Sequence, residues 1–150
     1  MMTLRQLADL VAYLREEVPV MATLSMDLRV TGNELRIEGS TDLPEGTLIA
    51  YEVRHEQLPV DYETPEWMLF REGVVPVTDG RFSARVDASA LDAGQLEVVA
   101  AFRSALPTGA VQPAPITDRF GANFEKLLGP NVVAMDGGAH SILVTRTVRR

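Results

Sequence analysis

The chain has 150 residues, of which 46% are hydrophobic and 23% charged, the composition of a single globular domain. Its net charge of −7 and pI near 4.8 exclude the basic surfaces on which nucleic-acid and anionic-membrane binding depend. Because the chain has no cysteine, disulfides and thiolate chemistry are also excluded, and a domain of this length needs neither a disulfide nor a metal to be stable.

The first eighteen residues, "MMTLRQLADLVAYLREEV", predict an amphipathic helix. Thr3 and Gln6 suit a capping box, and Pro19 ends the helix. Apolar residues recur at alternating steps of three and four: Leu4, Leu7, Val11, Leu14 and Val18. This narrow seam is too short for a coiled coil, and an isolated helix of this length is marginal in water. We interpret residues 1–18 as a docking helix whose seam makes oligomer contacts; the alternative is a cap on an open end of its own domain.

The same segment does not resemble a secretory signal, because Asp9, Glu16 and Glu17 interrupt what would have to be an apolar stretch. No stretch of the chain has the apolar length needed to span a bilayer. We therefore expect cytoplasmic synthesis without a signal peptide and no membrane insertion.

From residue 24 the apolar period changes to two. "TLSMDLRV" predicts a half-buried antiparallel strand, and Gly32 and Asn33 suit a two-residue hairpin loop. With that loop Leu28 faces Ile37, so the apolar residues of both strands share one face.

In "IEGSTDLPEGTLIAYEV", Gly39 is expected to close the second strand. Residues 40–46 are predicted to form a corner rather than a catalytic turn, because no histidine lies within a dozen residues of Ser40, Thr41 or Asp42 to act as a base.

"EGVVPVTDGRFSARVDA" predicts a second hairpin with a four-residue loop at 78–81, and Pro76 marks an edge strand because it has no N–H to donate. Further strands are expected at 96–102 and 142–148, with a short hairpin strand in "VVAMDGGAHSILV" and a short helix at 122–128. Together these elements predict a mainly β fold: an antiparallel immunoglobulin-like β-sandwich of seven to eight strands over residues 19–150, with the N-terminal helix outside it.

The stretches "EGSTDLPEGTLIAYEV" and "VTDGRFSARV", followed by a strand and a "QP" segment, resemble bacterial immunoglobulin-like modules. Those modules are built on a Gly-Thr-Thr-Asn-Leu-Pro-x-Gly-Thr corner, and the resemblance covers residues 24–115. Here Ser40 and Asp42 replace a Thr and the Asn of that corner. The resemblance implies a β-sandwich and little chemistry. It also implies an extracytoplasmic setting, whereas the first eighteen residues favour cytoplasmic synthesis.

Residues 56–70, "EQLPVDYETPEWMLF", form an acidic and aromatic loop. A divalent-metal site from His55, Asp61 and Glu63 is conceivable, but the spacing matches no recognised ligand pattern, and solvated loop carboxylates are far commoner. We therefore predict no metal, no cofactor and no catalytic residue, and keep a small hydrolase using His55 as a third hypothesis. The candidate binding residues of the loop are Tyr62, Trp67, Met68 and Phe70. Alternatively, Trp67 and Phe70 cover the core where the chain crosses between sheets.

The leading functional hypothesis is a non-enzymatic structural or assembly subunit. It would be a building block of a virion, filament or surface complex, a homo-oligomer or larger assembly that contacts other proteins through its N-terminal helix and loops. The alternative is a carbohydrate- or peptide-binding β-sandwich module that uses residues 56–70. A glycan or peptide array separates the two.

Changing Trp67 to Ala tests the binding loop. If Trp67 is a contact residue, the variant binds its partner more weakly, yet loses less than the roughly 3–5 kcal/mol of unfolding free energy that a buried aromatic contributes. Thermal and urea unfolding beside a binding assay distinguish the two outcomes. A large fall in melting temperature supports the core interpretation instead.

Overall fold

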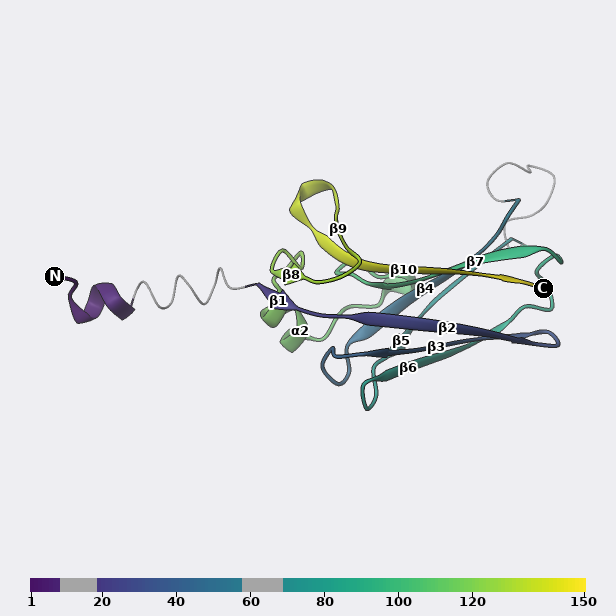
Figure 1. Ribbon diagram of the computed structural model, residues 1–150, viewed down its shortest axis with the longest axis horizontal. Coiled ribbons are helices and arrows are strands. Elements are labelled where there is room, and N and C mark those ends of the chain that lie inside the picture. Colours follow the sequence, from purple (N-terminus) through teal and green to yellow (C-terminus); the bar gives the residue numbers. More distant parts are fainter. Residues whose placement is uncertain (9–18, 58–68) are drawn as a thin grey trace.

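The computed structural model describes residues 1–8, 19–57 and 69–150 (Figure 1). A three-stranded sheet in the order β2-β3-β6 faces a five-stranded sheet in the order β5-β4-β7-β10-β9, and both are antiparallel. A small parallel pair, β1-β8, lies at one end. The strands are β1 (Val20–Met21), β2 (Leu24–Thr31), β3 (Glu34–Thr41), β4 (Leu48–His55), β5 (Phe70–Pro76), β6 (Arg81–Asp87), β7 (Gln95–Phe102), β8 (Leu127–Leu128), β9 (Val132–Ala134) and β10 (His140–Arg149). The predicted β-sandwich is therefore confirmed.

The N-terminal helix begins where the sequence predicts. Residues 4–8 are helical, the Thr3 N–H donates to Oε1 of Gln6 at 2.9 Å, and the Gln6 N–H donates to Oγ1 of Thr3 at 3.1 Å. These reciprocal bonds are the predicted capping box. The remainder of the predicted helix, residues 9–18, lies outside the described residues.

The first hairpin has the predicted register. Leu28 pairs with Ile37 and Val30 with Leu35, and the chain turns at residues 32–33. Gly32 has a φ of +60°, which a two-residue loop requires at its first position and which glycine adopts without strain. The second strand, however, does not close at Gly39 as predicted; β3 continues to Thr41.

The second predicted hairpin is wrong. Asp79 and Gly80 both have positive φ and make a tight two-residue turn, closed by reciprocal backbone bonds between Thr78 and Arg81. Beyond that bridge the two strands separate, since β5 pairs with β4 and β6 pairs with β3. The turn therefore carries the chain from one sheet to the other. The inference from Pro76 is confirmed, because β5 is an edge strand of the five-stranded sheet.

The helix predicted at 122–128 is also wrong, and one forms earlier, at α2 (Ala114–Phe120). Pro113 and Pro115 are compatible with it because the first turn of a helix makes no use of their missing N–H groups. Gly121, at a φ of +96°, ends the helix.

In the turn after α2, the Glu125 carboxylate accepts the Asn123 N–H at 2.9 Å. Hydrogen bonds from the backbone N–H groups of Glu125 and Asn123 lower the pKa of that carboxyl. The short strand β8 follows.

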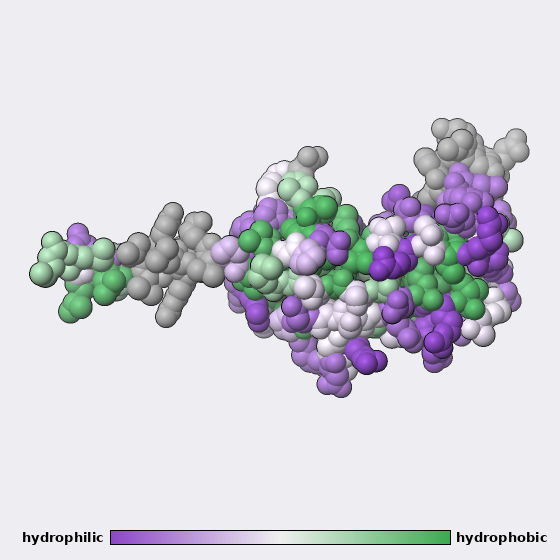
Figure 2. All heavy atoms as spheres, viewed as in Figure 1, coloured by the Kyte–Doolittle hydropathy of each residue, from purple (hydrophilic) through white to green (hydrophobic). Residues whose placement is uncertain are grey.

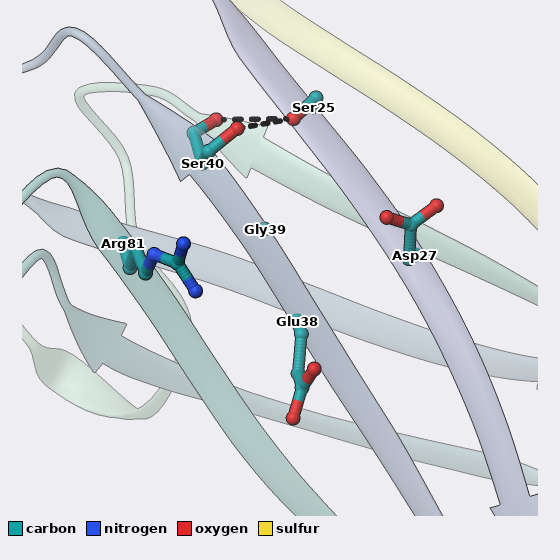
Figure 3. Close-up of a pocket in the computed structure, with 6 residues that line it drawn as sticks. All are labelled: Ser25, Asp27, Glu38, Gly39, Ser40 and Arg81. Carbon is teal, nitrogen blue, oxygen red and sulfur yellow. Dashed lines mark hydrogen bonds between the residues drawn. The ribbon is translucent and has the colours of Figure 1, made fainter.

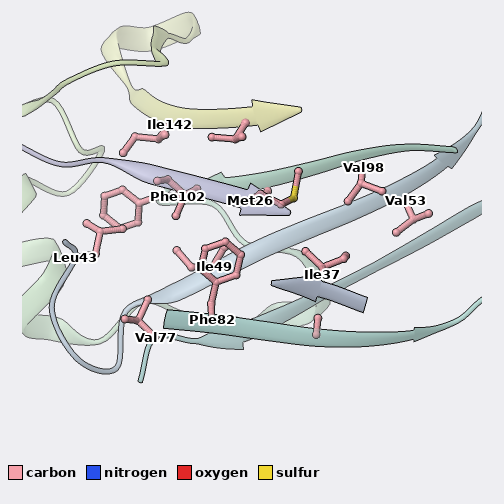
Figure 4. Close-up of a cluster of buried hydrophobic side chains, with 14 of the residues drawn as sticks. Met26, Ile37, Leu43, Ile49, Val53, Val77, Phe82, Val98, Phe102 and Ile142 are labelled. Atoms are coloured by element: carbon pink, nitrogen blue, oxygen red, sulfur yellow. The ribbon is translucent and has the colours of Figure 1, made fainter. Parts of the chain in front are cut away.

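The core lies between the two sheets and extends to the end where α2 lies (Figures 1 and 4). Inward-facing Met26, Ile37 and Phe82 meet Ile49, Val53 and Val98 of the opposite sheet (Figure 4). At the α2 end, the Phe102 ring stacks on Phe124 at 4.4 Å and meets the edge of Phe120 at 5.1 Å between ring centroids. This aromatic cluster fills one end of the core.

In each sheet an aromatic ring lies over a glycine on the neighbouring strand. Phe82 pairs with Gly39, and Tyr51 pairs with Gly73. A Cβ atom at Gly39 would collide with the Phe82 ring and with the carbonyl oxygen of Ser25, whereas a Cβ at Gly73 would meet only the Tyr51 side chain. Glycine is therefore required at both positions by close packing rather than by φ.

Gly73→Ala is expected to cost about 1–3 kcal/mol of unfolding free energy, because the added methyl overpacks the contact with Tyr51. In a Tyr51→Ala background the same change should cost much less, since the obstructing ring is gone. Urea unfolding of the four proteins of this double-mutant cycle measures the coupling. Gly39→Ala should cost more than Gly73→Ala, because a backbone oxygen also blocks that site; equal costs, or a cycle without coupling, contradict this explanation.

Candidate functional site

Of the four predicted binding residues, the structure places one. Phe70 begins β5, is half-buried, and has the guanidinium carbon of Arg54 6.0 Å from its ring centroid. Arg54 is also its cross-strand partner on β4. Tyr62, Trp67 and Met68 lie outside the described residues. Of the predicted binding loop, residues 56–70, the structure thus describes only residues 56–57 and 69–70.

His55 is a buried structural residue, with 2% of its surface exposed. Nε2 lies 3.1 Å from the carbonyl oxygen of Ala93, and Nδ1 lies 3.1 Å from the backbone N of Gln57. Because a carbonyl only accepts and a backbone N–H only donates, Nε2 carries the proton and Nδ1 accepts. Both ring nitrogens are therefore occupied, and neither is available as a general base or a metal ligand.

The metal set considered from the sequence is not assembled by the described residues. Asp61 and Glu63 lie outside them, and within residues 1–8, 19–57 and 69–150 no three His, Asp or Glu side chains gather as a metal site. Across the same residues no helix has the length and apolar character needed to cross a membrane.

The polar residues after β3 tie the corner to the start of β2. Thr41 Oγ1 donates to the Thr23 carbonyl at 2.6 Å and accepts the Leu43 N–H at 3.1 Å, while Oδ1 of Asp42 accepts the Thr23 N–H at 2.7 Å. Gly46 has a φ of +83°, and its N–H donates to Val77. These side chains satisfy backbone groups where the chain changes sheets, which is the structural role predicted for the corner.

The outward face of the three-stranded sheet carries a shallow polar hollow of about 200 Å³ (Figure 3). In it the Ser40 and Ser25 hydroxyls are 2.7 Å apart. The residues lining the hollow are Ser25, Asp27, Glu38, Gly39, Ser40 and Arg81. Since no histidine is among them, the hollow lacks a base of the Ser–His kind that would activate a serine. Its side chains are suited to ion pairs and hydrogen bonds with a partner.

The strand register arranges this whole face, which we call the charged face, in four rows across β2, β3 and β6. The rows are Ser25, Ser40 and Arg81; Asp27, Glu38 and Ser83; Arg29, Arg36 and Arg85; and Thr31, Glu34 and Asp87. Three arginines thus stand side by side, an arrangement that is unfavourable without compensating acids. Arg36 lies 3.6 Å from Glu38 and 3.8 Å from Glu34, and Arg85 lies 3.4 Å from Glu34.

Asp87, at the end of the charged face, is held in its ionised form. Hydrogen bonds from the hydroxyl and the backbone N–H of Ser89 lower the pKa of its carboxyl, and the nearby guanidinium groups of Arg71 and Arg150 act in the same direction.

Sequence reasoning identified the outward alternation of β2 but missed the rows of the charged face, because the rows appear only when the register of three strands is known.

Apolar side chains are exposed at the end of the molecule that bears the N-terminus, where Figure 2 shows green atoms on the helix and at the neighbouring end of the sandwich. Leu4 is 87% and Leu7 49% exposed, and Val11, Leu14 and Val18 lie outside the described residues. On the sandwich, Met21 pairs with Leu128 between β1 and β8, and both are exposed. Val133 and Met135, in and beside β9, are also exposed. We call these four sandwich residues the apolar end.

The sequence matches no protein-family model and no curated protein. Two crystal structures of OgpA from Akkermansia muciniphila align with this fold, one of the wild type and one of a catalytically inactive form in complex with an O-glycopeptide (glycodrosocin) substrate. They cover 89% and 87% of this chain at 11% and 9% identity, with TM-scores of 0.44 and 0.42. This chain spans 29% of the length of OgpA. Likeness at this level carries no argument about activity or ligand.

His55→Phe tests the structural role of the buried imidazole. The substitution keeps a planar ring but leaves the Ala93 carbonyl and the Gln57 N–H without their partner, so we expect a loss of about 1–3 kcal/mol in unfolding free energy. Urea denaturation measures it. His140→Phe is the matched control, because half-buried His140 makes one ring bond, to Leu127, at 3.0 Å. Unchanged stability together with loss of a measured activity would refute the structural role.

Proposed function

We propose that this protein is a non-enzymatic assembly subunit, in which the sandwich is the building block and the N-terminal helix joins neighbouring copies. The observation that carries the proposal is the exposure of Leu4 and Leu7 on a helix whose start is fixed by its own capping box. A short helix is stable only if its apolar stripe packs against something. Neither leucine is covered by the sandwich of its own chain.

The sandwich, in turn, does not need the helix to complete its core. Phe120 and Phe124 close the end at α2, and both are almost fully buried. A helix of the same chain is therefore not needed to bury these rings. We propose that its seam packs on another copy instead.

The apolar end offers such a surface. Met21, with 62% of its surface exposed, and its partner Leu128 form an apolar pair, and Val133 and Met135 add to it. Packing the seam of one chain on the apolar end of another repeats head to tail, which produces a ring or a filament. A virion, filament or surface complex is the kind of assembly to which this arrangement belongs.

The test replaces the two exposed leucines in the full chain, as Leu4→Ser/Leu7→Ser. We expect a smaller mass by light scattering and an unchanged melting temperature, because the leucines contribute to contacts between chains and not to the core. Arg5→Ser is the control for lost helix propensity and should keep the parental mass.

A parental mass in the leucine variant refutes docking through the helix. A monomeric parental protein that nonetheless binds a glycan or peptide on an array supports the alternative, a binding module using residues 56–70. Deleting residues 1–18 gives a second measurement: a folded, smaller product supports docking, and an unfolded product supports a cap.

A further inference from the structure

The charged face is electrically neutral in a chain that is strongly acidic. It contains four acids and four arginines, so its net charge is 4 − 4 = 0, whereas the whole chain carries −7. The acids are Asp27, Glu34, Glu38 and Asp87, and the arginines are Arg29, Arg36, Arg81 and Arg85. The charges also separate by row, with one all-arginine row between two rows that contain acids. Repulsion between two copies that meet at this face is therefore smaller than the net charge of the chain would produce.

Several of these charges have no partner in the described part of the chain. Among the residues that the structure describes, Arg36 and Arg85 are paired with glutamates, while Asp27, Arg29 and Arg81 make no ion pair or side-chain hydrogen bond. All three are exposed. Their charges are available to a partner without breaking a contact within the monomer.

The rows are complementary to themselves under one symmetry operation. Consider two copies whose charged faces meet, related by a two-fold axis that lies in the interface, perpendicular to the strands and midway between the second and third rows. This axis places the second row of one copy over the third row of the other. It likewise places the first row over the fourth. Each strand then lies antiparallel over its own copy. Asp27 faces the partner's Arg29, Glu38 faces the partner's Arg36, and Arg81 faces the partner's Asp87. The remaining positions bring a serine opposite Thr31, Glu34 or Arg85, so no two like charges meet.

The other face-to-face symmetry is excluded by the same rows. An axis parallel to the strands would keep each row over itself. Arg36 would then face the partner's Arg36, and Arg29 would face the partner's Arg85. Like charges directly opposed across an interface are strongly unfavourable. The pattern therefore specifies one orientation of the two sheets as well as the identity of the partner.

From this complementarity we propose that the charged face is an interface with a second copy of the chain, in which two β2-β3-β6 sheets pack antiparallel about a two-fold axis. Three strands about 4.8 Å apart and eight residues long cover on the order of 400 Å² per copy, about half of a standard interface. The contact is therefore weak and sensitive to salt. It uses a different surface from the N-terminal helix and does not depend on the function proposed above.

Charge-reversal variants of the full chain test the pairing. Sedimentation velocity should show association in about 0.01 M salt and its loss in about 1 M salt, where the screening length falls from about 30 Å to 3 Å. Asp27→Arg should weaken association at low salt by about tenfold, since each dimer loses two ion pairs and gains two repulsions. Arg29→Asp should do the same. The double variant Asp27→Arg/Arg29→Asp should restore it, because the exchanged charges face each other again.

Arg146→Asp is the control for a change in net charge away from the face and should leave association unchanged. Thermal unfolding of every variant confirms that it is folded. Association that is indifferent to salt and to both single reversals overturns the proposal, and so does a double variant that is not restored. Neither result depends on Leu4 or Leu7, so the two proposals fail separately.

Engineered cysteines test the orientation, which is straightforward in a chain without cysteine. Ser25 faces the partner's Thr31, so a mixture of Ser25→Cys and Thr31→Cys proteins should be joined into a heterodimer by a short bis-maleimide crosslinker, which spans the roughly 10 Å between two facing sheets. Ser25→Cys alone should not link to itself, because the two copies of Ser25 lie three rows, about 20 Å, apart. A homodimer of Ser25→Cys in preference to the mixed product overturns the antiparallel arrangement.

Discussion

The register of the β2–β3 hairpin is the constraint on which both the core and the charged face depend. Side chains on a strand alternate between faces, so a shift of one residue would exchange the inward and outward sets completely. With Gly32 and Asn33 in the loop, Met26 and Ile37 point into the core, and Asp27 and Glu38 point outward. The loop thus determines which residues are buried. It also determines which charges stand in the same row, and β6 extends that order to a third strand.

At the end of the sandwich beside α2, a short irregular segment buries the core, so the N-terminal helix is not needed to cover it. A turn of helix at α2, followed by Phe124 at a φ of +56°, brings two phenylalanine rings against Phe102. The β1–β8 pair then lies beside this closure rather than beneath the N-terminal helix. Because Phe120 and Phe124 fill this end of the core without the helix, the exposed Leu4 and Leu7 remain available for the contacts proposed above.

Features that follow from local pattern were predictable from the sequence. The period-two alternation of residues 24–30, the two-residue loop and the capping box each depend on neighbours within a few positions, and all three are present. The edge position of β5 followed from the missing N–H of Pro76. Whether the turn at Asp79 closes a hairpin or carries the chain to the other sheet was not predictable in this way. A tight turn is compatible both with a hairpin and with a change of sheet, and only the pairing partners on β3 and β4 decide between them.

Other features required information that a single stretch of sequence does not hold. The helix at Ala114–Phe120 was not predicted, although proline, present at 113 and 115, is well tolerated in the first turn of a helix. The role of His55 depended on Ala93, which lies far along the chain. The charged face was missed because its rows combine residues from three strands, the last of which begins forty positions after the second ends. The predicted contact residues Tyr62, Trp67 and Met68 remain predictions, since they lie outside the described residues.

The long separation in sequence between β3 and β6 also affects how the chain folds. Ladders between distant strands form slowly, because the intervening loop must be closed before any contact compensates for its entropy. Until β6 pairs with it, the β3 edge of the β2–β3 hairpin beside Gly39 is as bare as the outer edge of β2, and the apolar face of the hairpin lacks its opposite sheet. Unpaired edges of this kind recruit other chains into aggregates. During that interval we expect the alternating arginines and acids on the outward side to oppose aggregation of the partly folded chain. The residues that order the charged face of the folded protein would then also keep the folding intermediate in solution.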